Sequence, residues 1–295
     1  MRKIAIIGSN TKAGYAISKI LSKESKVEIY NFNHVDAILY EDIPWYGETI
    51  LLDLVDKNNF RKKLLSVKPH YIINAFDMDS IELCEEHKLS ARKYNVELVE
   101  NLVKAAKIGE CGLIQISSSE VYDKKKGYFA ETDIPQPTNY YGKTKLEAEN
   151  IIIPALTNYA ILRADNIFGY PIIDDGWFDS YFFLLKNNKR VDVSENIIFS
   201  PTFSDDIGWA VLNIIDKRIT GIFNVGMNNP VSQSVFFTKL CEIFSFQEKN
   251  INLKNKVRSE NTSVSLLKSK NSLHVNFADL EDAFLSLRFQ IENNN

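Results

Sequence analysis

Short apolar runs alternate along the first 170 residues with stretches in which apolar residues recur at helical spacing. The runs predict buried strands and the spacing predicts amphipathic helices. We expect strands near residues 3–8, 26–30, 49–52, 71–74, 112–117 and 159–163, and helices near 12–23, 56–67, 90–107 and 139–152. This alternation predicts an α/β fold with a doubly wound, mainly parallel sheet.

The regular alternation ends after residue 170, where residues 170–183 are rich in aromatic side chains. The chain is therefore divided into a larger domain, 1–170, and a smaller lobe, 171–295. One later apolar run, at 221–226, is expected to return to the sheet of the first domain. A last amphipathic pattern near 277–288 predicts a final helix.

Composition narrows the class of protein. The 295 residues are 45% hydrophobic, enough for one large core and a smaller one. No run approaches the roughly 18 apolar residues of a membrane span, and residues 1–3 lead directly into a strand, so we expect a cytoplasmic protein without a membrane partner. The three cysteines are widely spaced, which predicts reduced thiols and no metal site. A formal net charge of −3 without a basic tract makes nucleic acid an unexpected partner.

The first strand runs into a glycine turn and then a helix. Gly8 and Gly14 frame this turn, and backbone N–H groups at a helix N-terminus bind phosphate groups. The pattern predicts a nucleotide-binding βαβ unit. Thr11 lies between the two glycines, where a β-branched side chain would crowd the approach of a pyrophosphate.

Tyr141 and Lys145 are four residues apart in a predicted helix that follows the Ser-rich end of a strand at 117–119. The spacing puts the phenol and the ammonium on one helix face, where the cation should favour the phenolate and lower the pKa of Tyr141. A serine hydroxyl nearby would hold the oxygen that receives the proton. The residues predict acid catalysis at a carbonyl. Tyr140, at i, i+5 from Lys145, is the competing acid.

These segments together resemble the extended short-chain dehydrogenase/reductase superfamily over nearly the whole chain. The resemblance implies an NAD(P)-binding Rossmann domain and the catalytic residues Ser118, Tyr141 and Lys145. Thr11 replaces the second glycine of the family's Gly-x-x-Gly-x-x-Gly, and Phe76 breaks its Asn-Ala-Ala. The cofactor contacts that it implies are Gly8, Asn10, Thr11, Lys12, Ala13, Gly14, Asn31, Asp53, Leu54, Asn74, Ala75, Phe76, Asn95, Ile116, Tyr141, Lys145, Asn166 and Ile167.

Within the superfamily, two segments resemble different enzymes. Residues 200–210 resemble the Ser-Pro-Thr segment of dTDP-4-dehydrorhamnose reductases, and no arginine precedes it as it does in epimerases and decarboxylases. Residues 118–122 instead resemble the Thr-Ser-Glu-Val-Tyr of UDP-glucuronate decarboxylases, with Ser119 where sugar 4,6-dehydratases have an aspartate. We therefore expect a reductase that transfers hydride to carbon 4 of a nucleotide-linked keto-deoxysugar. The implied substrate contacts are Ser119, Glu120, Asn166, Trp177 and Pro201.

Two alternatives stay open at this point: a nucleotide-sugar epimerase, decarboxylase or dehydratase, and a non-catalytic NAD(P)-binding regulatory homologue. Both NAD(H) and NADP(H) are candidate cofactors. We expect the second strand to end at Asn31, without an acidic residue to repel a 2′-phosphate, which favours NADPH. A homodimer is expected.

Overall fold

The computed structural model describes residues 1–173, 176–254 and 259–293. Its centre is a seven-stranded sheet in the order β11-β6-β5-β4-β1-β2-β3, in which every neighbouring pair is parallel. The order reverses direction beside β1, as in a dinucleotide-binding fold. The strands are β1 (Arg2–Ile7), β2 (Val27–His34), β3 (Glu48–Leu52), β4 (Tyr71–Asn74), β5 (Gly112–Ser118), β6 (Tyr159–Ala164) and β11 (Gly221–Val225).

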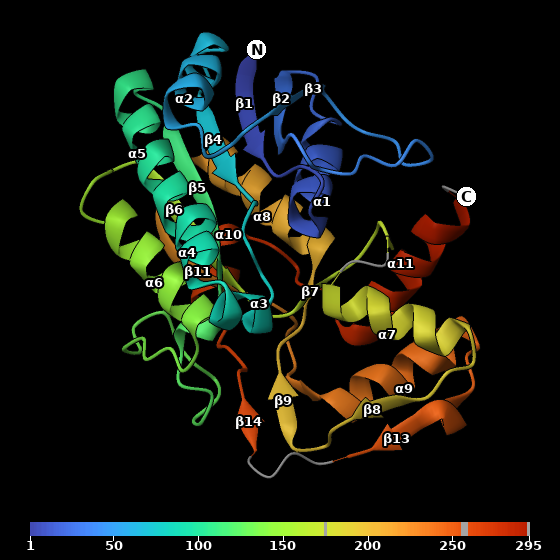
Figure 1. Ribbon diagram of the computed structural model, residues 1–295. Helices are drawn as coiled ribbons and strands as arrows, with labels where there is room; N and C mark the ends of the chain where they lie inside the picture. Colours follow the sequence, from blue (N-terminus) through green and yellow to red (C-terminus); the bar gives the residue numbers. More distant parts are fainter. Residues whose placement is uncertain (174–175, 255–258, 294–295) are drawn as a thin grey trace.

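Helices cover both faces of this sheet (Figure 1). One apolar core lies between the sheet and α2 (Lys57–Ser66), α5 (Leu98–Gly109) and α6 (Tyr140–Ile152). A second core lies on the opposite face, under α1 (Lys12–Leu21), α8 (Ser204–Lys217) and α10 (Leu267–Leu273). Because both faces are covered, the central strands are apolar almost throughout, and β4 and β5 are buried along their full lengths.

The lobe lies beyond the carboxyl ends of the strands (Figure 1). Its core is rich in aromatic side chains, which include Phe168, Phe178, Phe236 and Phe284. Its helices are α7 (Gly176–Lys186), α9 (Gln233–Phe244) and α11 (Leu280–Asn293), and its short strands are β8 (Val191–Val193), β9 (Ile197–Phe199), β12 (Val231–Ser232), β13 (Ile251–Leu253) and β14 (Glu260–Asn261). The parallel pair formed by β7 (Ile167–Phe168) and β10 (Thr202–Phe203) connects the lobe to the sheet domain.

The fold class is as predicted, and the differences are local. β11 returns to the sheet beside β6, as expected, but α8 joins the sheet domain without having been predicted. The predicted helix 90–107 is interrupted by a π-helical turn at Lys93–Glu97, between α4 (Lys88–Arg92) and α5. The short helix α3 (Ile81–Glu86) precedes α4. In the described residues no helix is both long and apolar enough to span a bilayer.

Candidate functional site

The glycine turn brings β1, α1 and the end of β4 into close contact. Gly8 has a φ of +80°, and a Cβ there would lie 2.7 Å from the Cβ of Phe76. A Cβ on Gly14 would lie 2.0 Å from the backbone oxygen of Gly8. Both positions therefore require glycine, which leaves the N-terminus of α1 open toward the end of the sheet.

Thr11 has a different role from the one expected. Its hydroxyl accepts a hydrogen bond from Gly14 N (3.1 Å) and lies within donating distance of the backbone oxygens of Gly8 (2.9 Å) and Ala75 (3.1 Å). Thr11 is thus the N-cap of α1 and connects this helix to the end of β4. The side chain that was expected to crowd the turn stabilises it.

The second strand is longer than predicted. β2 continues to His34, so Asn31 lies inside the sheet rather than at the strand end. Its amide contacts Ser18 Oγ (3.1 Å) and Tyr46 O (2.6 Å), away from the cavity described below. At the true strand end, His34 has the carboxylates of Asp36 and Asp53 at 3.4 and 3.6 Å. Acidic side chains therefore flank the end of β2. The preference for NADPH was based on the absence of such side chains, so the structure does not support it.

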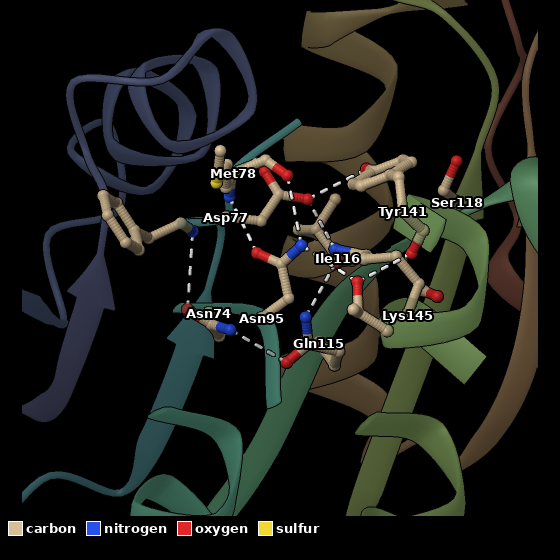
Figure 2. Close-up of polar contacts among 12 residues, drawn as sticks. Asn74, Asp77, Met78, Asn95, Gln115, Ile116, Ser118, Tyr141 and Lys145 are labelled. Carbon is tan, nitrogen blue, oxygen red and sulfur yellow. Dashed lines mark hydrogen bonds and ion pairs between the residues drawn. The ribbon is translucent and has the colours of Figure 1, made fainter. Parts of the chain in front are cut away.

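Tyr141 and Lys145 lie on one face of α6, as predicted, and a carboxylate lies against both (Figure 2). Asp77 Oδ2 accepts hydrogen bonds from Tyr141 OH at 2.9 Å and from Lys145 Nζ at 2.7 Å. The ammonium also donates to Ile116 O at 2.8 Å. Lys145 is buried, and its charge is balanced by Asp77.

The predicted lowering of the Tyr141 pKa is wrong for this arrangement. Burial raises the pKa of the phenol well above 10, and the neighbouring carboxylates of Asp77 and Asp79 raise it further. Hydrogen bonding with Ser118 opposes this shift only in part. Burial is the main cause, and the charge of Lys145, which is paired with Asp77, does not offset it.

Two asparagines predicted to contact the cofactor build the frame around this cluster. Asn95, in the π-helical turn, accepts from Met78 N (2.8 Å) and donates to Met78 O (3.1 Å) and Thr144 Oγ1 (3.0 Å). Asn74 donates to Gln115 Oε1 (3.0 Å) and accepts from Phe76 N (3.4 Å). Figure 2 shows both amides holding the segment that carries Asp77.

The two serines at the end of β5, Ser118 and Ser119, have different surroundings. Ser118 lines the cavity, and its hydroxyl accepts from Glu120 N at 3.1 Å. Ser119 is fully buried, donates to Asp165 Oδ1 at 2.8 Å and is not among the residues that line the cavity. Asp165 also accepts from Ser200 N (2.9 Å) and Thr262 Oγ1 (2.8 Å), and burial raises its pKa to about 6.

Glu120 serves the start of α6. Its carboxylate pairs with Lys124 Nζ at 2.7 Å and accepts from Asn139 Nδ2 at 2.5 Å. Asn139 is the N-cap of α6, where its side chain accepts from Gly142 N at 2.7 Å. Glu120 therefore orients the helix of Tyr141 in addition to lining the cavity.

A cavity of about 330 Å³ lies where the sheet, the glycine turn and the lobe meet. This volume falls within the range typical of small-molecule sites. The predicted residues that line it are Asn10, Thr11, Lys12, Ala13, Ala75, Phe76, Ile116, Ser118, Glu120, Tyr141, Asn166, Ile167 and Trp177. The predicted residues outside its wall are Gly8, Gly14, Asn31, Asp53, Leu54, Asn74, Asn95, Ser119, Lys145 and Pro201.

Two polar atoms in the wall of this cavity are left for a ligand. Asn10 Oδ1 and Trp177 Nε1 are buried and have no hydrogen-bond partner within the described ranges. One belongs to the glycine turn and the other to α7 of the lobe. Together with the open N-terminus of α1, this fits a dinucleotide on one side of the cavity and a second ligand under the lobe.

Lys12 connects the two sides of the cavity. Its Nζ lies 2.6 Å from Asp179 Oδ2 on α7 and 2.7 Å from Pro171 O. The glycine turn and the lobe are therefore joined by an ion pair whose carboxylate is fully buried.

Sequence reasoning missed Asp77, Asp79 and Asp165, all of which line the cavity. A signal for Asp77 was present, because it lies three residues beyond Asn74, at the carboxyl end of a central parallel strand where ligands bind in such sheets. The side-chain contacts of Asp77 with α6 have no counterpart in sequence spacing.

Metal-ligating side chains do not gather anywhere in the residues the structure describes, where no three of His, Cys, Asp and Glu could hold an ion. Cys84, Cys111 and Cys241 are all buried and free.

Comparison with known proteins agrees with this geometry. The family model described as RmlD substrate binding domain matches residues 1–279. The dTDP-4-dehydrorhamnose reductase of Aggregatibacter actinomycetemcomitans is 28% identical over 222 residues, 75% of this chain and 70% of that protein. Methionine adenosyltransferase 2 subunit beta of Rattus norvegicus is 31% identical over 260 residues, 85% of this chain and 74% of that protein.

A solved structure shows the same fold. The dTDP-4-dehydrorhamnose reductase of Bacillus anthracis str. Ames, in complex with NADP, has a TM-score of 0.84 and is 18% identical, with 98% of this chain and 100% of that chain covered. The family match extends over nearly the whole chain and includes both the sheet and most of the lobe. The chain therefore belongs to the RmlD substrate binding domain family, and with it to the extended short-chain dehydrogenase/reductase superfamily.

Proposed function

We propose that the protein reduces the 4-keto group of a nucleotide-linked deoxysugar. The observation that carries the proposal is the placement of Tyr141 OH, beside Ser118, in the wall of a cavity that the glycine turn borders on one side and the lobe on the other. A reductase needs these parts together: a proton donor, a dinucleotide site and a substrate site.

The chain's own groups have distinct tasks in this reaction. Tyr141 would donate the proton to the carbonyl oxygen, and Ser118 would hold that oxygen. The N-terminus of α1 and Asn10 would bind the dinucleotide, whose nicotinamide supplies the hydride. The free indole N–H of Trp177 would donate to the sugar or its nucleotide.

The substrate segment supports a reductase over an epimerase. In residues 199–203 the side chains are Phe, Ser, Pro, Thr and Phe, and all five residues are buried. Ser200 N donates to Asp165, and Ser200 Oγ accepts from Val264 N at 3.2 Å. This segment serves the packing of the lobe and offers no cation to nucleotide phosphates.

The test is a stoichiometric one. With a 4-keto sugar nucleotide such as a dTDP-4-keto-6-deoxyhexose, absorbance at 340 nm should fall in proportion to product, because a reductase consumes one reduced cofactor per turnover. The assay should be run with NADH and with NADPH, since Asp36 and Asp53 stand at the end of β2. Product formed with catalytic NAD⁺ at constant absorbance, or carbon dioxide from UDP-glucuronate, would instead identify an epimerase or a decarboxylase.

A second candidate is a regulatory subunit without turnover. Its support is the likeness to methionine adenosyltransferase 2 subunit beta and the hydrogen bonds that Asp77 accepts from both Tyr141 and Lys145. Calorimetry separates the two candidates: dinucleotide binding without oxidation of NADH or NADPH by any keto-sugar of the panel would favour the regulatory role.

A further inference from the structure

The carboxylate of Asp77 lies between the two groups that define the acid of this site. A single oxygen, Oδ2, accepts from both Tyr141 OH and Lys145 Nζ. The Asp77 side chain is 19% exposed, whereas that of Lys145 is 3% exposed. Asp77 therefore lies beside Tyr141 and Lys145, and it shares the wall of the cavity with Tyr141.

The position of this carboxylate is built into the backbone. Met78, the next residue, is held on both its N–H and its C=O by Asn95. Asn95 in turn bonds to Thr144, which lies on α6 between Tyr141 and Lys145. The segment of Asp77 and the helix of the acid are thus fixed to each other by side chains other than the acid itself (Figure 2).

We propose that Asp77 is a positioning residue that holds Tyr141 in its protonated form and so extends proton donation by the site to alkaline pH. The inference rests on the proposed reductase function and specifies how the acid of that reaction is kept ready. Asp77 acts through Tyr141, and its carboxylate does not need to touch the substrate.

The physical reason is the charge balance around the phenol. The groups that face Tyr141 are Asp77, Asp79, Lys145, Ser118 and Cys84, from the loop after β4, α6, the end of β5 and α3. A phenolate at this place would lie 2.9 Å from an accepting carboxylate oxygen. The two like charges repel, and Lys145 can neutralise only one of them.

A raised pKa still permits catalysis. When hydride reaches carbon 4, the developing alkoxide is a far stronger base than a phenolate, so transfer of the Tyr141 proton to that oxygen remains favourable. The transfer leaves a phenolate beside Asp77, and this phenolate takes its next proton from solvent water. Repulsion by Asp77 favours this return to the donor form.

The first experiment observes the phenol in the free protein and needs no activity. Tyrosine labelled with ¹³C at Cζ is incorporated, the Tyr141 resonance is assigned by its loss in Tyr141→Phe, and the resonance is followed from about pH 6 to pH 11 around the usual tyrosine pKa. In the wild type it should not titrate in this range. In Asp77→Asn the resonance should titrate within this range, which requires the midpoint to fall by about one pH unit or more.

Asp79→Asn is the matched control, because it removes an equal charge two residues along the same loop. It should move the midpoint less than Asp77→Asn does, since Asp77 both bonds and repels the phenol. Asp77→Ala serves as a second variant, with thermal unfolding to show that the fold is retained. A Tyr141 resonance that still does not titrate up to about pH 11 in folded Asp77→Asn and Asp77→Ala would overturn the proposal.

The second experiment connects the phenol to the reaction. The alkaline limb of kcat/KM reports the acid of the free enzyme. In Asp77→Asn this limb should move to lower pH by the same interval as the NMR midpoint. If the wild type reduces the sugar and the limb does not move, the role of Asp77 is excluded while the reductase function stands. If no keto-sugar is reduced, the function fails and the NMR titration still decides the role of Asp77.

Discussion

The hydroxyl groups of Tyr141 and Thr11 have different roles in the site. Tyr141 presents its OH to the cavity wall, where chemistry would occur. Thr11 turns its OH into the backbone of the glycine turn. Removal of the first hydroxyl should affect the reaction, and removal of the second should affect stability.

Replacement of Tyr141 with Phe should lower turnover by roughly 10²- to 10⁴-fold, the usual effect of removing a positioned general acid. Dinucleotide affinity, measured by calorimetry, should change little. Tyr140→Phe is the control. The hydrogen bond from Tyr140 to Glu85 Oε1, at 2.7 Å, is made by the backbone N–H, so this substitution keeps it. If turnover were lost in Tyr140→Phe and not in Tyr141→Phe, the acid would be Tyr140 instead of Tyr141.

Thr11→Val keeps the side-chain shape and removes the hydroxyl. Loss of the N-cap of α1 should lower the free energy of unfolding by about 0.5–2 kcal/mol, measured by denaturant titration. Thr11→Ser, which retains a hydroxyl, should restore most of it. Equal stability of Thr11→Val and wild type would contradict the capping role.

A buried carboxylate on α8, that of Asp206, forms a hydrogen bond with the segment that precedes α11. Its Oδ2 accepts from Ala278 N at 2.9 Å, and burial raises its pKa from 3.8 to about 7. The folded state therefore binds this proton more tightly than the unfolded state does. Between about pH 4 and pH 7 the unfolded state ionises first, so the contribution of Asp206 to stability falls as pH rises.

Asp206→Asn should remove this pH dependence while its amide oxygen still accepts from Ala278. Since one pKa unit corresponds to about 1.4 kcal/mol, the wild type should lose on the order of 4 kcal/mol more than the variant across this window. Denaturant unfolding at several pH values measures the difference. Asp216→Asn, a half-exposed carboxylate on the same helix, is the control and should follow the wild-type curve. Parallel curves for Asp206→Asn and wild type would contradict the prediction.

Strand and helix periodicity predicted the sheet because both of its faces are buried, which leaves long apolar runs in the sequence. It did not predict α8, whose apolar face packs against α1 nearly 200 residues away in the sequence. The site divides in the same way. Tyr141 and Lys145 follow from spacing within one helix, whereas Asp77 reaches them through a loop whose course depends on Asn95.

Segments from both sides of residue 170 build the sheet domain. The outer edge of β6 is covered by β11, and α1 is covered by α8, both from beyond that boundary. A fragment of residues 1–170 should therefore fail to unfold cooperatively, whereas the full chain should give a sharp thermal transition. Cooperative unfolding of the fragment with native-like near-UV circular dichroism would contradict this.

The late return of β11 has a consequence for how the protein is made. During synthesis β6 leaves the ribosome before residues 221–225 that complete the sheet, so its edge stays available to other strands in the meantime. A reading frame that stopped just after residue 170 would still encode every predicted site residue except Trp177 and Pro201. Its product would nevertheless lack an assembled site, because the sheet that positions those residues is completed only by the later part of the chain.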